Sequence, residues 1–322
     1  MTEKIRVGIV GYGNIGKGAE MAIAHNPDFE LAAIFTRRQP EPDTKQVSVS
    51  EAVNYVDKID LMLMCGGSAS DLPAQVPEFV KLFNTIDTFD THAKIPEYFA
   101  RVDEVARQSG HLAMISTGWD PGLFSLARVL MEAVLPTGRD YTFWGRGVSQ
   151  GHSDAVRRIP GVKDARQYTV PREAVLKEIR LGGTKEYSPR EMHTREVFVL
   201  LKEGADPEKI EWEIKNMPNY FEPYDTFVHF VDEETMKREH HAMPHGGWVV
   251  RSGITGDYTR EIMEFRLKLD SNPEFTSSAM LAFARAAYRM AREGRVGCCT
   301  VYDVPLGYLL PADMDFLRRE KL

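Results

Sequence analysis

The chain has 322 residues, enough for about two domains, and its 43% hydrophobic and 27% charged residues are typical of a globular protein. Its 47 acidic and 40 basic residues give a formal net charge of −7, which argues against a nucleic-acid-binding protein, because such proteins present a basic face. Three cysteines without CxxC spacing exclude a zinc ribbon and fit a reducing cytoplasm, and the apolar runs are too short to span a bilayer.

The first third of the chain alternates between strand and helix patterns. A β-branched run at 5–10 predicts a strand, apolar residues at helical spacing predict a helix over 15–25, and a second apolar run predicts a strand over 29–35. Later segments continue the alternation, with strands expected at 61–65, 85–88 and 113–116 and helices at 77–83 and 96–108. This order predicts a doubly wound parallel sheet.

The pattern changes after Gly118. A helix is expected over 123–135, and the last helix over 276–293. Strands of a mostly antiparallel sheet are expected at 141–144, 196–201, 226–231, 248–252 and 261–269. We therefore predict an α/β domain made of residues 1–120 plus about 295–322, and a second, α+β domain over 121–294.

A glycine-rich turn follows the first predicted strand. Gly11, Gly13 and Gly16 fit the GxGxxG pattern, and this context makes the pattern a dinucleotide fingerprint of the Rossmann type. The first glycine permits the tight turn, the second lets the backbone approach a pyrophosphate, and the third allows close packing of helix on strand. The alternative is a loop that only needs flexible residues.

The end of the second predicted strand indicates which dinucleotide binds. An NAD enzyme usually has an acidic residue here to hold the ribose 2′-hydroxyl, but this chain has Thr36, Arg37 and Arg38. Guanidinium groups and a hydroxyl suit a 2′-phosphate, so we predict NADP. The alternative is that both arginines are solvated loop charges.

Several longer motifs, in order along nearly the whole chain, resemble those of meso-diaminopimelate dehydrogenases. They are the segments 10–16, 35–38, 86–90, 116–122, 143–144, 149–154, 157–161, 243–247 and 268–273. The region 180–191 is harder to match. The resemblance implies that the chain converts meso-2,6-diaminopimelate, NADP and water into L-2-amino-6-oxopimelate (which cyclises to tetrahydrodipicolinate), ammonia and NADPH, reversibly, in lysine biosynthesis. It also implies a homodimer formed through the second domain.

The resemblance places Asp90 and Asp120 at the reacting D-centre. The amine must be neutral before hydride leaves its carbon, and a nearby carboxylate can hold the ammonium and help to move its proton. Both residues follow predicted strands at the edge of the sheet where ligands bind. For Asp120, the alternative is a turn residue that bonds its own backbone before Pro121.

The remaining candidate residues surround the substrate and the cofactor. Trp119 and Trp144 would form apolar walls, although Trp144 could simply end a core strand. Arg195 would pair with the carboxylate of the far L-centre, although most single arginines are surface residues. The other substrate-binding candidates are Gln150, Gly151, Thr169, His245 and Asn272. The expected cofactor-binding residues are Gly11, Tyr12, Gly13, Asn14, Ile15, Gly16, Thr36, Arg37, Arg38, Cys65, Gly66 and Ser68.

Other interpretations stay open at this point. His240, His241 and His245 suggest a metal site, but no cysteine accompanies them and we expect none. Ser153 and Asp154 are expected to cap a helix. A broader D-amino-acid dehydrogenase, another two-domain NADP oxidoreductase such as a dihydrodipicolinate reductase, and a non-catalytic NADP sensor are the alternative functions. A sensor would need the glycine turn and the arginines but no paired carboxylates.

Overall fold

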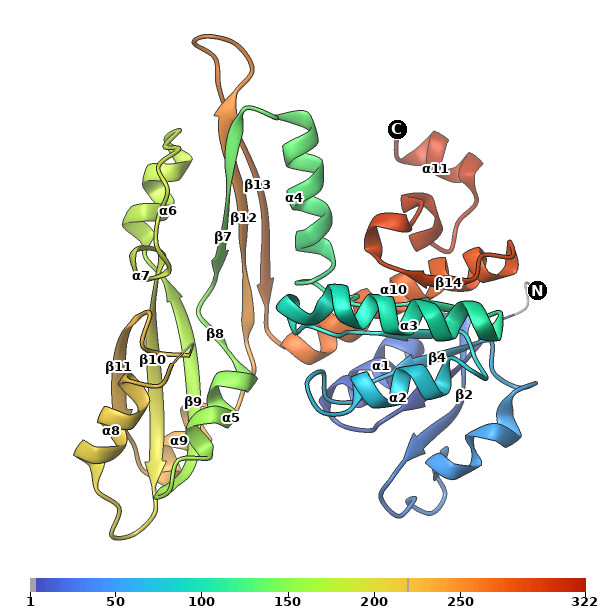
Figure 1. The fold of residues 1–322 in the computed structure, drawn as a ribbon, viewed down its shortest axis with the longest axis horizontal. Helices are drawn as coiled ribbons and strands as arrows, with labels where there is room; N and C mark the ends of the chain where they lie inside the picture. Colours follow the sequence, from blue (N-terminus) through green and yellow to red (C-terminus); the bar gives the residue numbers. More distant parts are fainter. Residues whose placement is uncertain (1–3, 219) are drawn as a thin grey trace. The chain divides into compact units, whose positions relative to one another are not determined.

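The computed structural model describes residues 4–218 and 220–322 and divides the chain into two compact units (Figure 1). Unit 1 contains the residues up to Leu126 together with Pro273–Leu322, and unit 2 is Ala127–Asn272. In the described residues, no helix is long and apolar enough to cross a membrane.

Unit 1 is built on a seven-stranded parallel sheet with the order β14-β6-β5-β4-β1-β2-β3. Its strands are β1 (Ile5–Val10), β2 (Phe29–Thr36), β3 (Gln46–Ser48), β4 (Leu61–Met64), β5 (Thr85–Asp87), β6 (Leu112–Met114) and β14 (Gly297–Cys299). The chain runs from β1 to β2 and β3 on one side and then crosses to β4 on the other. The strand order therefore reverses between β1 and β4, and ligands of doubly wound sheets bind at the carboxyl ends of the strands at this switch point. The predicted fold class is confirmed.

Helices and apolar side chains cover both faces of this sheet. The helices are α1 (Asn14–Ala24), α2 (Leu72–Phe79), α3 (Ile95–Ser109), α10 (Asn272–Arg292) and α11 (Met314–Glu320). Short 3-10 turns lie at Val49–Tyr55, His92–Lys94, Val301–Asp303 and Leu306–Leu309. One core joins α1 and α10 to the sheet, and the other joins α2 and α3. Helix α2 begins at Leu72 rather than at 77, because Pro73 lies in the first turn, where proline is tolerated.

The predicted domain boundary is wrong for the long helix near the C-terminus. We assigned residues 273–294 to the second domain, but they belong to unit 1. Met280, Phe283 and Ala287 on α10 are fully buried in the same core as Ile5 and Val7 of β1. The helix therefore completes the apolar covering of the parallel sheet.

Unit 2 contains two smaller sheets. One has the order β11-β10-β9-β8 and the other β13-β12-β7, and every pairing is antiparallel except β10 with β11. The strands are β7 (Gly138–Trp144), β8 (Gly147–Val148), β9 (Val162–Pro171), β10 (His193–Leu201), β11 (Asp225–Phe230), β12 (His245–Ile254) and β13 (Arg260–Leu269). The helices are α4 (Leu123–Val134, which begins in unit 1), α5 (Gln150–Arg157), α6 (Glu173–Arg180), α7 (Pro189–Met192), α8 (Pro207–Lys215) and α9 (Glu233–Glu239). The α+β prediction is confirmed.

Candidate active site

The glycines of the turn after β1 have the conformations and surroundings that their predicted roles require. Gly11 has φ +92°, a left-handed conformation that residues with a side chain rarely adopt. A Cβ on Gly16 would lie 2.1 Å from the carbonyl oxygen of Gly11, so only glycine lets α1 pack this closely. A Cβ on Gly13 would meet nothing within 4 Å. The backbone at Gly13 is therefore open to a close approach from outside.

A pocket of about 260 Å³ lies beside this turn, at the carboxyl ends of β1, β2 and β4. Eight of the predicted cofactor-binding residues line it: Gly11, Tyr12, Gly13, Thr36, Arg37, Arg38, Cys65 and Gly66. Asn14, Ile15, Gly16 and Ser68 are not among its lining residues; the first three form the first turn of α1. Burial raises the pKa of the Cys65 thiol, so this cysteine is an inert wall of the pocket rather than a nucleophile.

The arginine end of the pocket also contains carboxylates that the sequence did not single out. Arg37 forms an ion pair with Asp71 (3.0 Å), and Asp71 in turn accepts a hydrogen bond from the N–H of Gly67. The hydroxyl of Thr36 accepts from the N–H of Arg38 at 3.1 Å and so shapes the turn. The Arg37 side chain is 67% exposed, and such a surface pair holds it only weakly. Asp71 follows Gly66-Gly67 closely, a signal that could have identified it.

Asp90 lies on the exposed surface just beyond β5. Its backbone N–H donates to the hydroxyl of Ser68 at 2.9 Å, and this hydroxyl lies 3.4 Å from that of Thr91. Ser68, predicted as a cofactor-binding residue, therefore connects the loop after β4 to the loop after β5. The Asp90 carboxylate is left at the surface of unit 1.

Trp119 and Asp120 lie in the loop after β6. The Trp119 ring is 7% exposed and meets Phe124 edge-on, with ring centroids 5.2 Å apart. Asp120 is partly exposed and precedes Pro121 through a cis peptide bond. A short bridge between Trp119 and Gly122 closes the turn. The loop thus buries the indole and leaves Asp120 partly exposed.

In unit 2, Arg195 is 5% exposed although it carries a full positive charge. It lies opposite Thr169 in the pairing of β10 with β9, and its guanidinium donates to the Thr169 hydroxyl. Its guanidinium carbon lies 4.0 Å from the ring centroid of Tyr224, and its Nε has no hydrogen-bond partner. Within residues 4–218 and 220–322, no carboxylate pairs with it. Burial lowers the pKa of Arg195, a sign that its charge is poorly compensated.

His193 lies two residues before Arg195 on β10 and contacts Trp144. Trp144 was predicted as a substrate-binding residue, whereas His193 was not considered. The backbone N–H of Trp144 donates to Nε2 of His193 (3.1 Å), and the centroids of the two rings lie 5.4 Å apart. Burial, with a smaller effect of Arg195, lowers the pKa of His193 to about 3, so this imidazole is neutral. Both residues line a pocket of about 350 Å³ that Tyr224 also lines.

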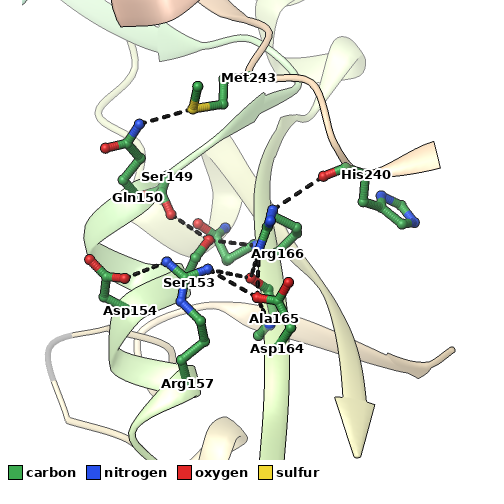
Figure 2. Close-up of polar contacts among 11 residues, drawn as sticks. Ser149, Gln150, Ser153, Asp154, Arg157, Asp164, Ala165, Arg166, His240 and Met243 are labelled. Atoms are coloured by element: carbon green, nitrogen blue, oxygen red, sulfur yellow. Dashed lines mark hydrogen bonds and ion pairs between the residues drawn. The ribbon is translucent and has the colours of Figure 1, made fainter. Parts of the chain in front are cut away.

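Ion pairs and hydrogen bonds connect helix α5 to strand β9 (Figure 2). Asp164 on β9 pairs with Arg166 at 2.6 Å and with Arg157 of α5 at 3.4 Å. Ser153 and Asp154 lie inside α5, so the predicted capping role is wrong: the Ser153 hydroxyl donates to the carbonyl of Ser149, and Asp154 pairs with Arg157. Arg157, the last residue of α5, therefore attaches the end of the helix to β9.

Gln150 and Gly151 begin this helix. The amide of Gln150 contacts the sulfur of Met243 at 3.1 Å (Figure 2), and a Cβ on Gly151 would meet nothing within 4 Å. The first N–H groups of a helix lack partners within the helix, and the Ser149 side chain does not cap them. The start of α5 therefore offers hydrogen-bond donors to an approaching ligand.

His245 and Asn272 lie at the ends of the neighbouring segments of unit 2. His245 begins β12, and a Cβ on Gly147 would lie 2.6 Å from its ring, so the glycine makes room for the imidazole. The N–H of Asn272 donates to the carbonyl of Met243 at 2.9 Å. In the part of the chain that the structure describes, no group of three or more histidine, cysteine or acidic side chains is placed to hold a metal ion.

A doubly wound sheet with a glycine turn at its switch point, joined to an α+β unit, is the architecture of two-domain, dinucleotide-binding oxidoreductases. The family model for the diaminopimelic acid dehydrogenase C-terminal domain matches residues 118–271. The chain is 58% identical to the meso-diaminopimelate D-dehydrogenase of Ureibacillus thermosphaericus, over 99% of both chains.

Two solved structures are also similar over the whole chain. One is the Corynebacterium glutamicum DAP dehydrogenase in complex with DAP, 44% identical, with a TM-score of 0.95 over 100% of both chains. The other is an engineered D-amino acid dehydrogenase bound to NADP+, 43% identical, with a TM-score of 0.89 over 99% of this chain and 100% of that one. The chain belongs to the meso-diaminopimelate D-dehydrogenase family.

Proposed function

We propose that this chain oxidises the D-centre of meso-2,6-diaminopimelate. The substrate, NADP+ and water become L-2-amino-6-oxopimelate, ammonium and NADPH with release of a proton, in lysine biosynthesis. The observation that carries the proposal is the buried guanidinium of Arg195, which has no carboxylate partner among the described residues. A buried charge without a partner is costly, and a substrate carboxylate would compensate it through two parallel hydrogen bonds.

The other substrate contacts follow from the same chemistry. Thr169 already holds one guanidinium nitrogen of Arg195, and His245 and Asn272 add an imidazole and an amide at the L-centre. At the D-centre, Gln150 and Gly151 offer donors to the other carboxylate, and the indoles of Trp119 and Trp144 keep water away. Each end of the substrate therefore has its own carboxylate-binding groups, and its two amines lie in different surroundings.

Asp90 and Asp120 would act on the reacting amine. Either carboxylate can hold the ammonium, and one of them helps to remove the proton that must leave before the carbon is oxidised. Both are accessible residues at the carboxyl edge of the parallel sheet of unit 1. The proton then passes to solvent.

The pocket beside the glycine turn fits NADP. Gly13 is open to a pyrophosphate, and the amino end of α1 favours its negative charge. Arg37 and Arg38 would bind the 2′-phosphate, with Arg37 exchanging its weak surface pair with Asp71 for the phosphate. When bound, the nicotinamide supplies the hydride acceptor. We also propose that the protein is a cytoplasmic homodimer, which its three buried free thiols and the large sheets of unit 2 support.

The experiment follows NADPH absorbance with the purified chain. We expect a signal with meso-diaminopimelate and NADP, and none with the L,L or D,D isomers. D-amino acids without a second carboxylate should react poorly, because they leave Arg195 unpaired. Efficient turnover of such amino acids would support a broad D-amino-acid dehydrogenase instead. Tight NADP binding with no turnover of any isomer would support a sensor.

A further inference from the structure

Asp87, the last residue of β5, is a buried carboxylate that the proposed mechanism does not use. Its side chain is 1% exposed, and no lysine or arginine pairs with it within the described part of the chain. Burial raises the pKa of Asp87 to about 6, although its hydrogen bonds act in the opposite direction. A buried carboxylate is retained at such a cost only where its oxygens are needed.

The oxygens of Asp87 accept hydrogen bonds from two different loops. Oδ1 accepts from the backbone N–H of Phe89, in the loop after β5, and from that of Ser116, in the loop after β6, both at 2.9 Å. The carbonyl oxygen of Asp87 accepts from the N–H (2.9 Å) and the hydroxyl (2.7 Å) of Thr117. One residue therefore joins the ends of both loops.

Each of these loops carries one of the aspartates proposed to act on the amine. Phe89 directly precedes Asp90, and Ser116 precedes Asp120 by four residues. Ser116 has φ +58°, a left-handed conformation that is unfavourable for serine and persists only where its surroundings impose it. Its hydrogen bond to Asp87 is such a constraint, at the point where the second loop begins.

Helix α3 fixes the other oxygen of the same carboxylate. The Tyr98 hydroxyl donates to Oδ2 of Asp87 at 2.6 Å, and its ring stacks on Phe89 with centroids 4.2 Å apart. Tyr98 is itself 5% exposed. The carboxylate therefore cannot rotate without breaking bonds to the helix and to both loops.

We propose that Asp87 is a positioning residue, whose carboxylate holds the loops of Asp90 and Asp120 in one arrangement for the reaction. This role rests on the proposed function, because it matters for turnover only if these aspartates act on the substrate. Asp87 touches neither substrate nor cofactor in this account.

The test compares an apolar and a polar replacement of the same carboxylate. Asp87→Leu introduces a larger, apolar side chain that accepts no hydrogen bond, whereas Asp87→Asn has nearly the volume of aspartate and keeps one acceptor oxygen for the two N–H groups. For Asp87→Leu we expect kcat to fall about 100-fold, the loss that a displacement near 1 Å produces, while the Kd for NADP stays within about twofold. Asp87→Asn should restore kcat to within about tenfold of the wild type.

Ile86→Ala is the matched control. Ile86 is the preceding residue of β5, is fully buried and packs in the core on the other side of the sheet, so its truncation lowers stability without touching either loop. We expect its kcat to stay within about threefold of the wild type. A loss in Asp87→Leu no larger than that in Ile86→Ala, or no rescue by Asp87→Asn, would overturn the proposal.

Hydrogen exchange of the segments 88–92 and 115–120, measured without substrate, gives a readout independent of turnover. Both segments should exchange faster in Asp87→Leu and at the wild-type rate in Ile86→Ala; unchanged exchange in Asp87→Leu overturns the proposal. If Asp87→Leu does not fold, Tyr98→Phe replaces it. This variant should lower kcat about three- to tenfold and speed the exchange of the same segments, and a wild-type kcat together with wild-type exchange would again overturn the proposal. If the wild-type chain does not oxidise diaminopimelate, the proposed function is refuted. The hydrogen-exchange rates then still show whether Asp87 holds the two loops in place.

Discussion

Replacing Arg195 by methionine should have opposite effects on stability and on activity. The guanidinium is almost completely buried, and it contacts the Thr169 hydroxyl and both the ring and the polar end of Tyr224, but no carboxylate among the described residues. A buried charge without a carboxylate partner costs stability, and well-packed apolar replacements of buried ionic groups are often neutral or stabilising, by up to about 4 kcal/mol. We therefore expect Arg195→Met to melt at a temperature at least ~2 °C higher than the wild type.

The activity of the same variant should fall steeply. Removing one partner of a buried charge pair costs about 2–5 kcal/mol, which corresponds to a loss of about 30-fold to several thousand-fold in kcat/KM for meso-diaminopimelate. The assays are thermal unfolding and initial rates of NADPH formation. The Kd for NADP should not change, because Arg195 lies in unit 2 and the pocket beside the glycine turn is made by unit 1.

Arg251 provides the control for this prediction. It is 3% exposed, as buried as Arg195, but it pairs with Asp140 at 2.9 Å and donates to the carbonyl of Leu135 at 2.6 Å. Arg251→Met should therefore destabilise the protein, because it leaves a carboxylate and a carbonyl without their partner. An Arg195→Met variant that melts lower than the wild type and keeps kcat/KM within about twofold would show that Arg195 is not an uncompensated charge that binds the substrate.

Three further predictions concern the other parts of the site. Arg37→Ala with Arg38→Ala should raise the KM for NADP far more than that for NAD, and equal effects on both would argue against a 2′-phosphate contact. Asp120→Ala should lower kcat by about 100-fold or more with an unchanged Kd for NADP, as expected when a proton-transfer group is lost, and wild-type turnover would remove Asp120 from the mechanism. The pKa of Asp87 is about 6 in the folded protein and 3.8 for an ordinary aspartate. The protonated side chain therefore contributes stability that is fully present below pH 3.8 and is lost as the pH rises through 6. Between pH 5 and pH 8, urea unfolding should therefore show Asp87→Asn gaining about 1.4 kcal/mol relative to the wild type, and a difference independent of pH would contradict the raised pKa.

The first unit was largely predictable from the sequence because its signals are local. The β-branched run of β1, the glycines of the turn and the helical spacing of α1 lie within thirty residues and support one another. The assignment of α10 was not predictable, because its apolar face matches β1 only through contacts between residues more than two hundred positions apart.

The second unit shows why polar strands escape a search for apolar alternation. Strand β9 has Lys163, Asp164 and Arg166 among its residues, and its buried positions include Gln167 and Thr169. Thr169 lies opposite Arg195, and Gln167 donates to the Thr169 hydroxyl at 3.5 Å. The strand that carries part of the candidate site therefore lacks the apolar alternation by which strands are predicted. The role of Asp87 could not be predicted either. A carboxylate at the end of a strand is expected to be exposed, and only the structure shows the donors that surround it.

Isotope labelling identifies the carbon of the substrate that loses hydride. With meso-diaminopimelate deuterated only at the D-centre, we predict one deuterium on the reduced nicotinamide and a slower initial rate than with unlabelled substrate. Unlabelled NADPH from this substrate, or deuterium transfer from material labelled only at the L-centre, would contradict the account.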